Sequence, residues 1–171
     1  MRAGNEKIFK MPDSCPICQS NVIQKDIFYY CKNKKCPARN QRELIHFVNA
    51  FEIYEIGPKI LDRLKEEGLI TDASDLFLLE RVDLANLDRF GEKSAENIIN
   101  SINSHKKISL WRFIYALGIL HVGEQTARDI AEAFGTLQKI ISSKEEEISE
   151  IENIGPVVSK SLYEFFQSKT N

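Results

Sequence analysis

The four cysteines of this 171-residue chain lie in one short stretch, in the pattern C-x2-C-x12-C-x4-C. Thiolates are strong zinc ligands, and four of them with no open position form a closed tetrahedral site that serves structure rather than catalysis. A segment this short buries too little apolar surface to fold alone, and a bound metal supplies the missing free energy. The spacing therefore predicts one structural Zn²⁺ held by Cys15, Cys18, Cys31 and Cys36.

Two other uses of the cysteines are less favoured. Two disulfides need an oxidising compartment, and the N-terminal MRAGNEKIFK lacks the apolar core of a secretory signal. A redox CxxC pair is expected beside a βαβ pattern, which is absent.

His46 is expected to be a helix residue rather than a metal ligand. NVIQKDIFYY, between the cysteine pairs, predicts a short β-hairpin. Four aromatic side chains are expected to pack this module rather than stack on bases: Phe9, Phe28, Tyr29 and Tyr30.

The elements beyond the cysteines repeat around four glycines, at intervals of 34, 32 and 32 residues. Each glycine has apolar residues four positions and one position before it, a small or apolar residue four positions after it, and an apolar residue seven positions after it. Self-similarity at such a period indicates repeated structural units. The glycines are Gly57, Gly91, Gly123 and Gly155.

The offsets predict a helix, a short hairpin and a second helix in each unit, because the positions after the glycine share one helix face. Each glycine is expected to take a positive φ in a tight turn. Pro58 and Pro156 suit the first position of a helix. The N-terminus of the second helix offers free N–H groups and a positive dipole end, which suit a phosphate. We expect helices over 42–51, 58–67 and 92–104, and a capping box of Ser143 and Glu146.

The fold expected is mainly α: a small four-cysteine zinc module with a short β-hairpin, then four helix-hairpin-helix units packed in pairs. The expected domains are a linker over 1–13, a zinc finger over 14–40 and a tandem helix-hairpin-helix domain over 41–171.

No apolar run is long enough for a membrane span. Residues 1–50 carry nine basic and four acidic residues, a net charge of +5, which leaves −7 for residues 51–171. Any binding of a polyanion by the helical part must therefore come from local geometry rather than bulk charge.

The repeated unit resembles the helix-hairpin-helix motif of proteins that bind DNA without sequence specificity. Together with the four-cysteine module, it resembles the zinc-finger and helix-hairpin-helix region of bacterial NAD-dependent DNA ligases. The resemblance rests on GNEKIFKMPDSCPIC, KKCPARNQRELIHF, GEKSAENI, RFIYALGILHVGEQTAR and IENIGPVV. It implies a cytoplasmic, nucleoid-associated protein that grips the backbone of nicked duplex DNA in replication and repair. It also implies that NAD is used by the full-length enzyme and is not bound by this segment.

Parts of that family's pattern are missing here. The adenylated lysine lies in a K-x-D-G motif, which does not occur in this chain. The adenylation, oligonucleotide-binding and BRCT domains are absent too, so no catalytic residue is predicted and the chain alone is expected to be inactive. We expect a fragment, or a split-gene product whose partner carries the adenylation and oligonucleotide-binding portion. Glu55 is a local departure, since an acid in the first hairpin repels phosphate.

The expected DNA contacts are the hairpin backbones and the polar residues around them. Two alternatives stay open: a DNA-binding element of another repair protein, and a protein-docking module, which the acidic helical part favours. The predicted DNA-binding residues are Gly57, Lys59, Arg89, Gly91, Lys93, Ser94, His121, Gly123, Gln125, Thr126, Gly155 and Lys160.

Overall fold

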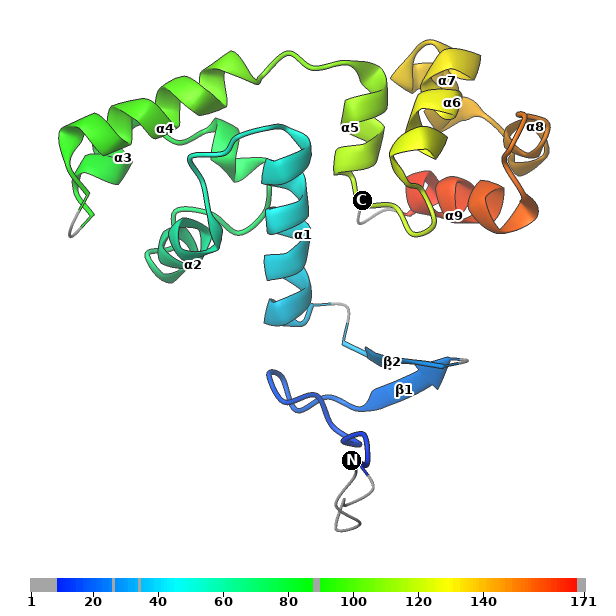
Figure 1. Ribbon diagram of the computed structural model, residues 1–171, viewed down its shortest axis with the longest axis horizontal. Coiled ribbons are helices and arrows are strands. Elements are labelled where there is room, and N and C mark those ends of the chain that lie inside the picture. The colour runs from blue at the N-terminus through cyan, green and yellow to red at the C-terminus, as the bar shows by residue number, and fades with distance from the viewer. Residues whose placement is uncertain (1–8, 26, 34, 88–89, 169–171) are drawn as a thin grey trace, which may run out of the picture. The chain divides into compact units, whose positions relative to one another are not determined.

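The computed structural model describes residues 9–25, 27–33, 35–87 and 90–168. Regular structure in these residues is mainly helical, with one two-stranded antiparallel sheet (Figure 1), as the sequence predicts. None of the helices described is both long and apolar enough to cross a membrane.

The strands are β1 (Val22–Lys25) and β2 (Phe28–Cys31), and the first helices are α1 (Pro37–Ala50), α2 (Pro58–Glu66), the 3-10 helix η1 (Asp75–Phe77), α3 (Arg81–Ala85) and α4 (Glu92–Ser104). The remaining helices are α5 (Leu110–Ala116), α6 (Glu124–Phe134), α7 (Leu137–Ser142), α8 (Glu145–Ser149) and α9 (Pro156–Gln167).

The chain divides into two compact units, Met1–Arg42 and Glu43–Asn171. The first unit contains the predicted β-hairpin, in which β1 and β2 pair antiparallel with Val22 opposite Cys31 and Lys25 opposite Phe28. This register brings the last residue of β2 back beside the start of β1. It therefore returns Cys31 toward the segment that carries the first two cysteines.

The second unit is built from the four predicted helix-hairpin-helix units. Their second helices are α2, α4, α6 and α9, and each begins directly after a glycine of the repeat. Helices α3 and α4, α5 and α6, and α8 and α9 pack directly against one another, and Figure 1 shows α5 beside α6. The residues four and seven positions after each glycine are buried, as the spacing predicts: Leu61, Leu64, Ala95, Ile98, Ala127, Ile130, Ser159 and Leu162.

The buried side chains form two hydrophobic clusters that follow the predicted pairing of units. One contains the helices of the first two repeats, and the other contains those of the third and fourth. Helix α5 belongs to both, because Ala116 lies in the first cluster and Ile114 in the second. A lone helical hairpin buries little apolar surface, and pairing gives each hairpin a second layer to pack on.

Polar contacts join the two clusters along α5. His46 Nε2 lies 2.7 Å from the Tyr115 carbonyl oxygen, and the two rings meet edge to face with centroids 4.8 Å apart. Arg112 forms an ion pair with Glu52. His46 is therefore a helix residue, as expected, and its ring contacts Tyr115 of α5.

Two boundary predictions are wrong. Helix α1 begins at Pro37 rather than near residue 42, because the chain turns into the helix directly after Cys36. The cap of α8 is also shifted by one residue. The Lys144 N–H donates to Glu147 Oε2 at 2.8 Å, whereas the buried Ser143 hydroxyl donates back to the Ile140 carbonyl at 2.7 Å. Ser143 is thus used to close α7 rather than to start α8.

Candidate metal site and nucleic-acid interface

The four cysteine sulfurs meet at one point of the first unit. Cys15 and Cys18 lie in the turn before β1, Cys31 ends β2, and Cys36 precedes α1. The turn is closed by hydrogen bonds from the Cys15 N–H to the Ser20 carbonyl and from the Gln19 N–H to the Cys15 carbonyl. All four Sγ atoms lie within 4.8 Å of one another, so this cluster can hold a metal ion.

The cluster has the dimensions of a tetrahedral thiolate site. Cys15 Sγ lies 3.9 Å from Cys36 Sγ, and Cys18 Sγ lies 3.4 Å from Cys31 Sγ. Four sulfurs at about 2.3 Å from a central Zn²⁺ are about 3.8 Å apart, close to both separations. A disulfide requires about 2.05 Å, and all four cysteines are free thiols. The donor set and its spacing therefore fit zinc.

The thiols differ in how readily they lose a proton. A hydrogen bond from the Ser20 side chain is the main cause that lowers the pKa of Cys18 to about 6. Burial raises the pKa of Cys31 to about 12. Backbone N–H groups of Cys18 and Ile17 lower the pKa of Cys15. Metal binding to such a set releases protons, because each ligating sulfur must be a thiolate.

The aromatic residues of this unit do not pack it, and that prediction is wrong. Phe9 is 78% exposed and Phe28 is 59% exposed, while Tyr29 and Tyr30 are also exposed. The only ring contact between them in the described residues joins Phe28 and Tyr30, with centroids 6.3 Å apart. A two-stranded sheet has two open faces, and the cysteine cluster covers too little of either to bury these rings.

The four repeat glycines are N-caps, and the prediction of a positive φ at them is wrong. Gly57, Gly91, Gly123 and Gly155 have φ between −81° and −86° with extended ψ values. An ideal Cβ built on any of them meets nothing within 4 Å. Neither the backbone conformation nor packing within the chain requires glycine there. What glycine provides is an unobstructed approach to the first N–H groups of the following helix.

In the third and fourth hairpins, a positive φ lies two residues before the glycine. His121 has φ 67° and Asn153 has φ 66°, each two positions before its glycine. Asparagine and histidine are enriched among the residues that tolerate this region. The equivalent position of the second hairpin is Arg89, a predicted DNA contact that lies outside the described residues. The sequence predicted His121 as a DNA-binding residue, but it did not predict that a positive φ at His121 turns the chain before Gly123.

The predicted polar side chains that the structure describes lie in or next to the first turns of the four helices, and His121 precedes its helix. Lys59, Lys93, Ser94, Gln125 and His121 are exposed, whereas Thr126 is half-buried. Gln125 donates to Asp129 Oδ1 at 2.8 Å. Lys160 lies one turn into α9 and pairs with Glu164 at 3.8 Å, with 64% of its side chain exposed. These side chains surround four separate helix N-termini rather than converging on one pocket.

The first hairpin differs from the others because it carries two acids that contact other helices. Glu52 pairs with Arg112 of α5, which lowers the pKa of Glu52 and raises that of Arg112. A hydrogen bond from the Ser101 hydroxyl of α4 is the main cause that lowers the pKa of Glu55. Both carboxylates are therefore held as anions in the segment that leads into α2, and they connect this hairpin to its neighbours.

A cluster beside the third hairpin was not predicted. The Arg128 guanidinium lies 3.5 Å from the centroid of the Trp111 ring, and its Nη2 donates to Glu124 Oε1 at 2.8 Å. Arg112 lies 5.0 Å from the same ring centroid. The i,i+4 spacing of Glu124 and Arg128 signals an ion pair, but no sequence rule places Trp111 of another helix against it.

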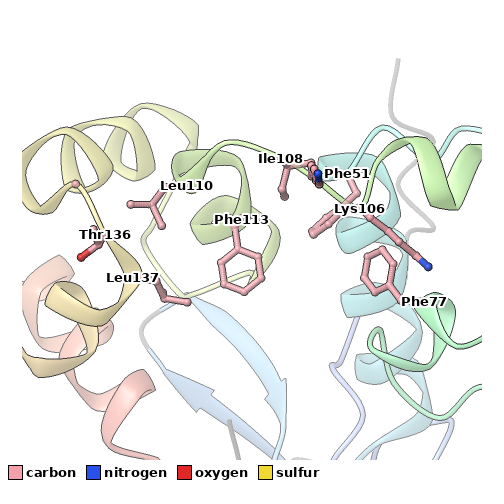
Figure 2. A pocket seen from close by; sticks show the side chains of 10 residues that line it. Phe51, Phe77, Lys106, Ile108, Leu110, Phe113, Thr136 and Leu137 are labelled. Atoms are coloured by element: carbon pink, nitrogen blue, oxygen red, sulfur yellow. The ribbon is translucent and has the colours of Figure 1, made fainter.

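An apolar groove lies within the second unit, and its lining includes none of the four repeat glycines or the predicted DNA-binding residues. It has a volume of about 750 Å³, and Figure 2 shows Phe51 and Phe77 on one side and Leu110, Phe113 and Leu137 on the other. Its charged lining residues are Lys106 and Lys107. The lining holds no acid, histidine or cysteine among the described residues, so it offers no pair of groups for proton transfer or nucleophilic attack.

Comparisons with known proteins agree with this geometry. A family of the helix-hairpin-helix motif matches residues 112–171, and a family described as a SAM-like helix-hairpin-helix tandem matches residues 51–104. Similar relatives are proteins named DNA ligase from Desulforudis audaxviator, Desulfitobacterium hafniense and Carboxydothermus hydrogenoformans, at 42%, 42% and 43% identity. Each match covers 99% of this chain and 26% of the relative, so the chain spans about a quarter of the length of these curated relatives.

Proposed function

We propose that this chain is a DNA-binding part of an NAD-dependent DNA ligase, which holds the nicked duplex by its backbone while the nick is sealed in replication and repair. In this proposal the chain contributes no catalytic residue. NAD is used elsewhere in the full-length enzyme, and the protein acts in the bacterial cytoplasm at the nucleoid. The adenylation and oligonucleotide-binding portion of the ligase is its partner.

One observation carries the proposal: four helices begin at unobstructed glycines in a chain that is similar over its length to DNA ligases. A helix N-terminus offers backbone N–H donors and the positive end of a dipole, a combination that suits a phosphate group of any nucleotide. Backbone donors carry no sequence information, which suits an enzyme that must act on nicks in any sequence. The overall negative charge of residues 51–171 restricts binding to these local sites.

The same proposal assigns the parts of the chain. Residues 1–13, of which 1–8 lie outside the described residues, are assigned as a linker, residues 14–40 as a zinc finger and residues 41–171 as the tandem helix-hairpin-helix domain. The metal at the four cysteines is Zn²⁺ in a structural role, supported by the separations of their sulfurs and by the closed ligand set that four thiolates make. When bound, it supplies a fixed crosslink among the knuckle, the β-hairpin and the start of α1.

A second candidate is a protein-docking module, within a ligase or another DNA-repair protein. The observation that favours it is the apolar groove with two lysines on its rim. Docking there does not involve the hairpin glycines. DNA binding that depends on the glycines, and not on substitutions in the groove, separates the two functions.

The test is the affinity of the full chain for a nicked duplex as a function of salt. We expect binding that is independent of sequence and favours duplex over single strands. The slope of log K against log salt should correspond to a few phosphates, at about 0.9 per phosphate. Gly123→Val should weaken binding by about tenfold, because the branched side chain blocks phosphate from donors that bind a charged group. Lys93→Ala, which removes one exposed side chain, should weaken it less.

The backbone conformation and surroundings of Gly123 indicate that Gly123→Val changes access to the helix N-terminus without disturbing the fold. Valine adopts φ −84° readily, and its Cβ meets nothing within 4 Å, so the fold should survive. The loss of a favourable N-cap costs about 1 kcal/mol at most, which a thermal melt can quantify. Wild-type affinity in a folded Gly123→Val protein would reject the third hairpin as a DNA contact and favour the docking module.

A further inference from the structure

Arg128 is held from two sides, by its own helix α6 and by the neighbouring helix α5. Its guanidinium stacks on Trp111 of α5 at 3.5 Å from the ring centroid, and it donates to the carboxylate of Glu124, the first residue of α6. The Arg128 side chain remains 43% exposed. An arginine stacked on an aromatic face loses part of its conformational freedom before any ligand arrives.

The guanidinium reaches the N-terminal turn of its helix. In an α-helix each Cα–Cβ bond tilts toward the N-terminus, so a side chain at one position covers the turn before it. The 2.8 Å contact with Glu124 places the charged group of Arg128 at that first turn. The same turn begins at Gly123, whose backbone leaves the helix N–H groups accessible.

The chemistry of this group matches a phosphate. A guanidinium carries five N–H donors in a fixed plane and binds phosphate through two of them at once. Within the described residues, one hydrogen bond to one carboxylate oxygen is observed for Arg128, so a phosphate has to displace that one hydrogen bond to engage the whole fork. Glu124 is the acid in the first turn of α6, where negative charge is favoured by the helix N-terminus.

We propose that Arg128 is a phosphate-binding side chain of the third hairpin, that Trp111 positions its guanidinium, and that Glu124 competes with the phosphate for it. This inference rests on the proposed DNA binding and adds a side-chain contact to the backbone donors of the same hairpin. DNA binding then requires Arg128 to exchange the carboxylate for a phosphate without leaving the tryptophan ring.

Titrations of the full chain with nicked duplex over a range of salt concentrations test each role. Arg128→Gln should weaken binding about tenfold and reduce the salt slope by about one phosphate. Arg128→Lys should keep the slope but recover only part of the affinity, because a lysine binds phosphate as a point charge without the planar fork. Trp111→Leu should weaken binding about threefold with an unchanged slope, since the charge stays and its positioning is lost.

Glu124→Gln gives the readout that a merely structural role would not produce. Removing the competing carboxylate should strengthen DNA binding about threefold, the worth of an exposed ion pair. Arg63→Gln is the matched control. Arg63 pairs with Glu67 at 2.9 Å in the same i,i+4 geometry and is 38% exposed, but it lies in the last turn of α2. It should leave affinity and slope near the wild-type values.

Several results would overturn the inference. Arg128→Gln with an unchanged slope, an equal loss in Arg63→Gln, or weaker binding in Glu124→Gln would each do so. If the wild-type chain binds DNA and Gly123→Val removes that binding while Arg128→Gln does not, the proposed function stands and this inference alone fails. If the wild-type chain shows no salt-dependent binding, both fail. Thermal melts of each variant confirm that the fold is retained.

Discussion

Cys31 is the residue on which the first unit depends most. It is the last residue of β2, and its sulfur lies in the cysteine cluster. Cys31→Ser should abolish stoichiometric zinc and unfold residues 14–38, because the described residues of this unit form no hydrophobic cluster that could replace the metal. Helicity should be largely retained, since most helices belong to the other unit. Elemental analysis and far-UV circular dichroism measure the two effects.

A matched control for this prediction is Ser20→Ala. It removes the hydroxyl that stabilises the Cys18 thiolate but leaves all four ligands, so the protein should keep one zinc per chain. Full zinc occupancy in Cys31→Ser, or an absence of metal in wild-type protein purified without chelator, would contradict the structural-zinc proposal.

Residue-level predictions from sequence succeed where a side chain's role follows from its spacing along the chain. The cysteine pattern identifies the cluster, and the period of the repeat identifies its buried positions. The position of the positive φ could not be predicted, because glycine is compatible with either sign and the spacing does not say which turn residue bears it. The Arg128–Trp111 stack depends on how α5 and α6 rotate against each other, which no local pattern specifies.

At the scale of the elements, the four hairpins are alike in backbone but not in surroundings. Gly57→Val should change affinity for nicked duplex less than about twofold, whereas Gly91→Val should weaken it about tenfold. The reason is that the first hairpin carries two acids with lowered pKa values, Glu52 and Glu55, in the five residues before Gly57, and their negative charge disfavours a phosphate. Titrations of the two variants in parallel measure the difference.

The two glycine substitutions are well matched. Their φ values are −85° and −81°, and neither added Cβ meets an atom within 4 Å. Any difference in affinity therefore reports on the DNA rather than on the fold. Equal losses would mean that the acids of the first hairpin do not exclude phosphate. The acid at Glu55 was visible in the sequence, but its hydrogen bond from α4 was not, because it joins two repeats.

For the molecule as a whole, the pairing of repeats into two clusters followed from the need of each hairpin for a packing partner. Their junction at α5 did not follow from the sequence. It depends on His46 reaching the Tyr115 carbonyl and on Glu52 reaching Arg112. Each of these is a contact between distant parts of the chain, and a pattern with a period of about 32 residues contains no information about it.

The whole chain should also lack the chemistry of nick sealing. Incubated with labelled NAD or ATP and Mg²⁺, the protein should form no covalent adenylate and should seal no nick. Adenylation needs a nucleophilic lysine activated in a nucleotide pocket, and the sequence contains no K-x-D-G motif. The apolar groove is lined by Lys106 and Lys107 but by no acid that could bind a metal ion or accept a proton.

The control for this assay is a full-length bacterial NAD-dependent DNA ligase, which shows that the label and the nicked substrate are competent. A labelled band that survives denaturation in this chain would require an active site of its own and would overturn the proposal that it only binds DNA. Lys106→Ala combined with Lys107→Ala would then show whether the groove holds that site, because these are the two amines that line it.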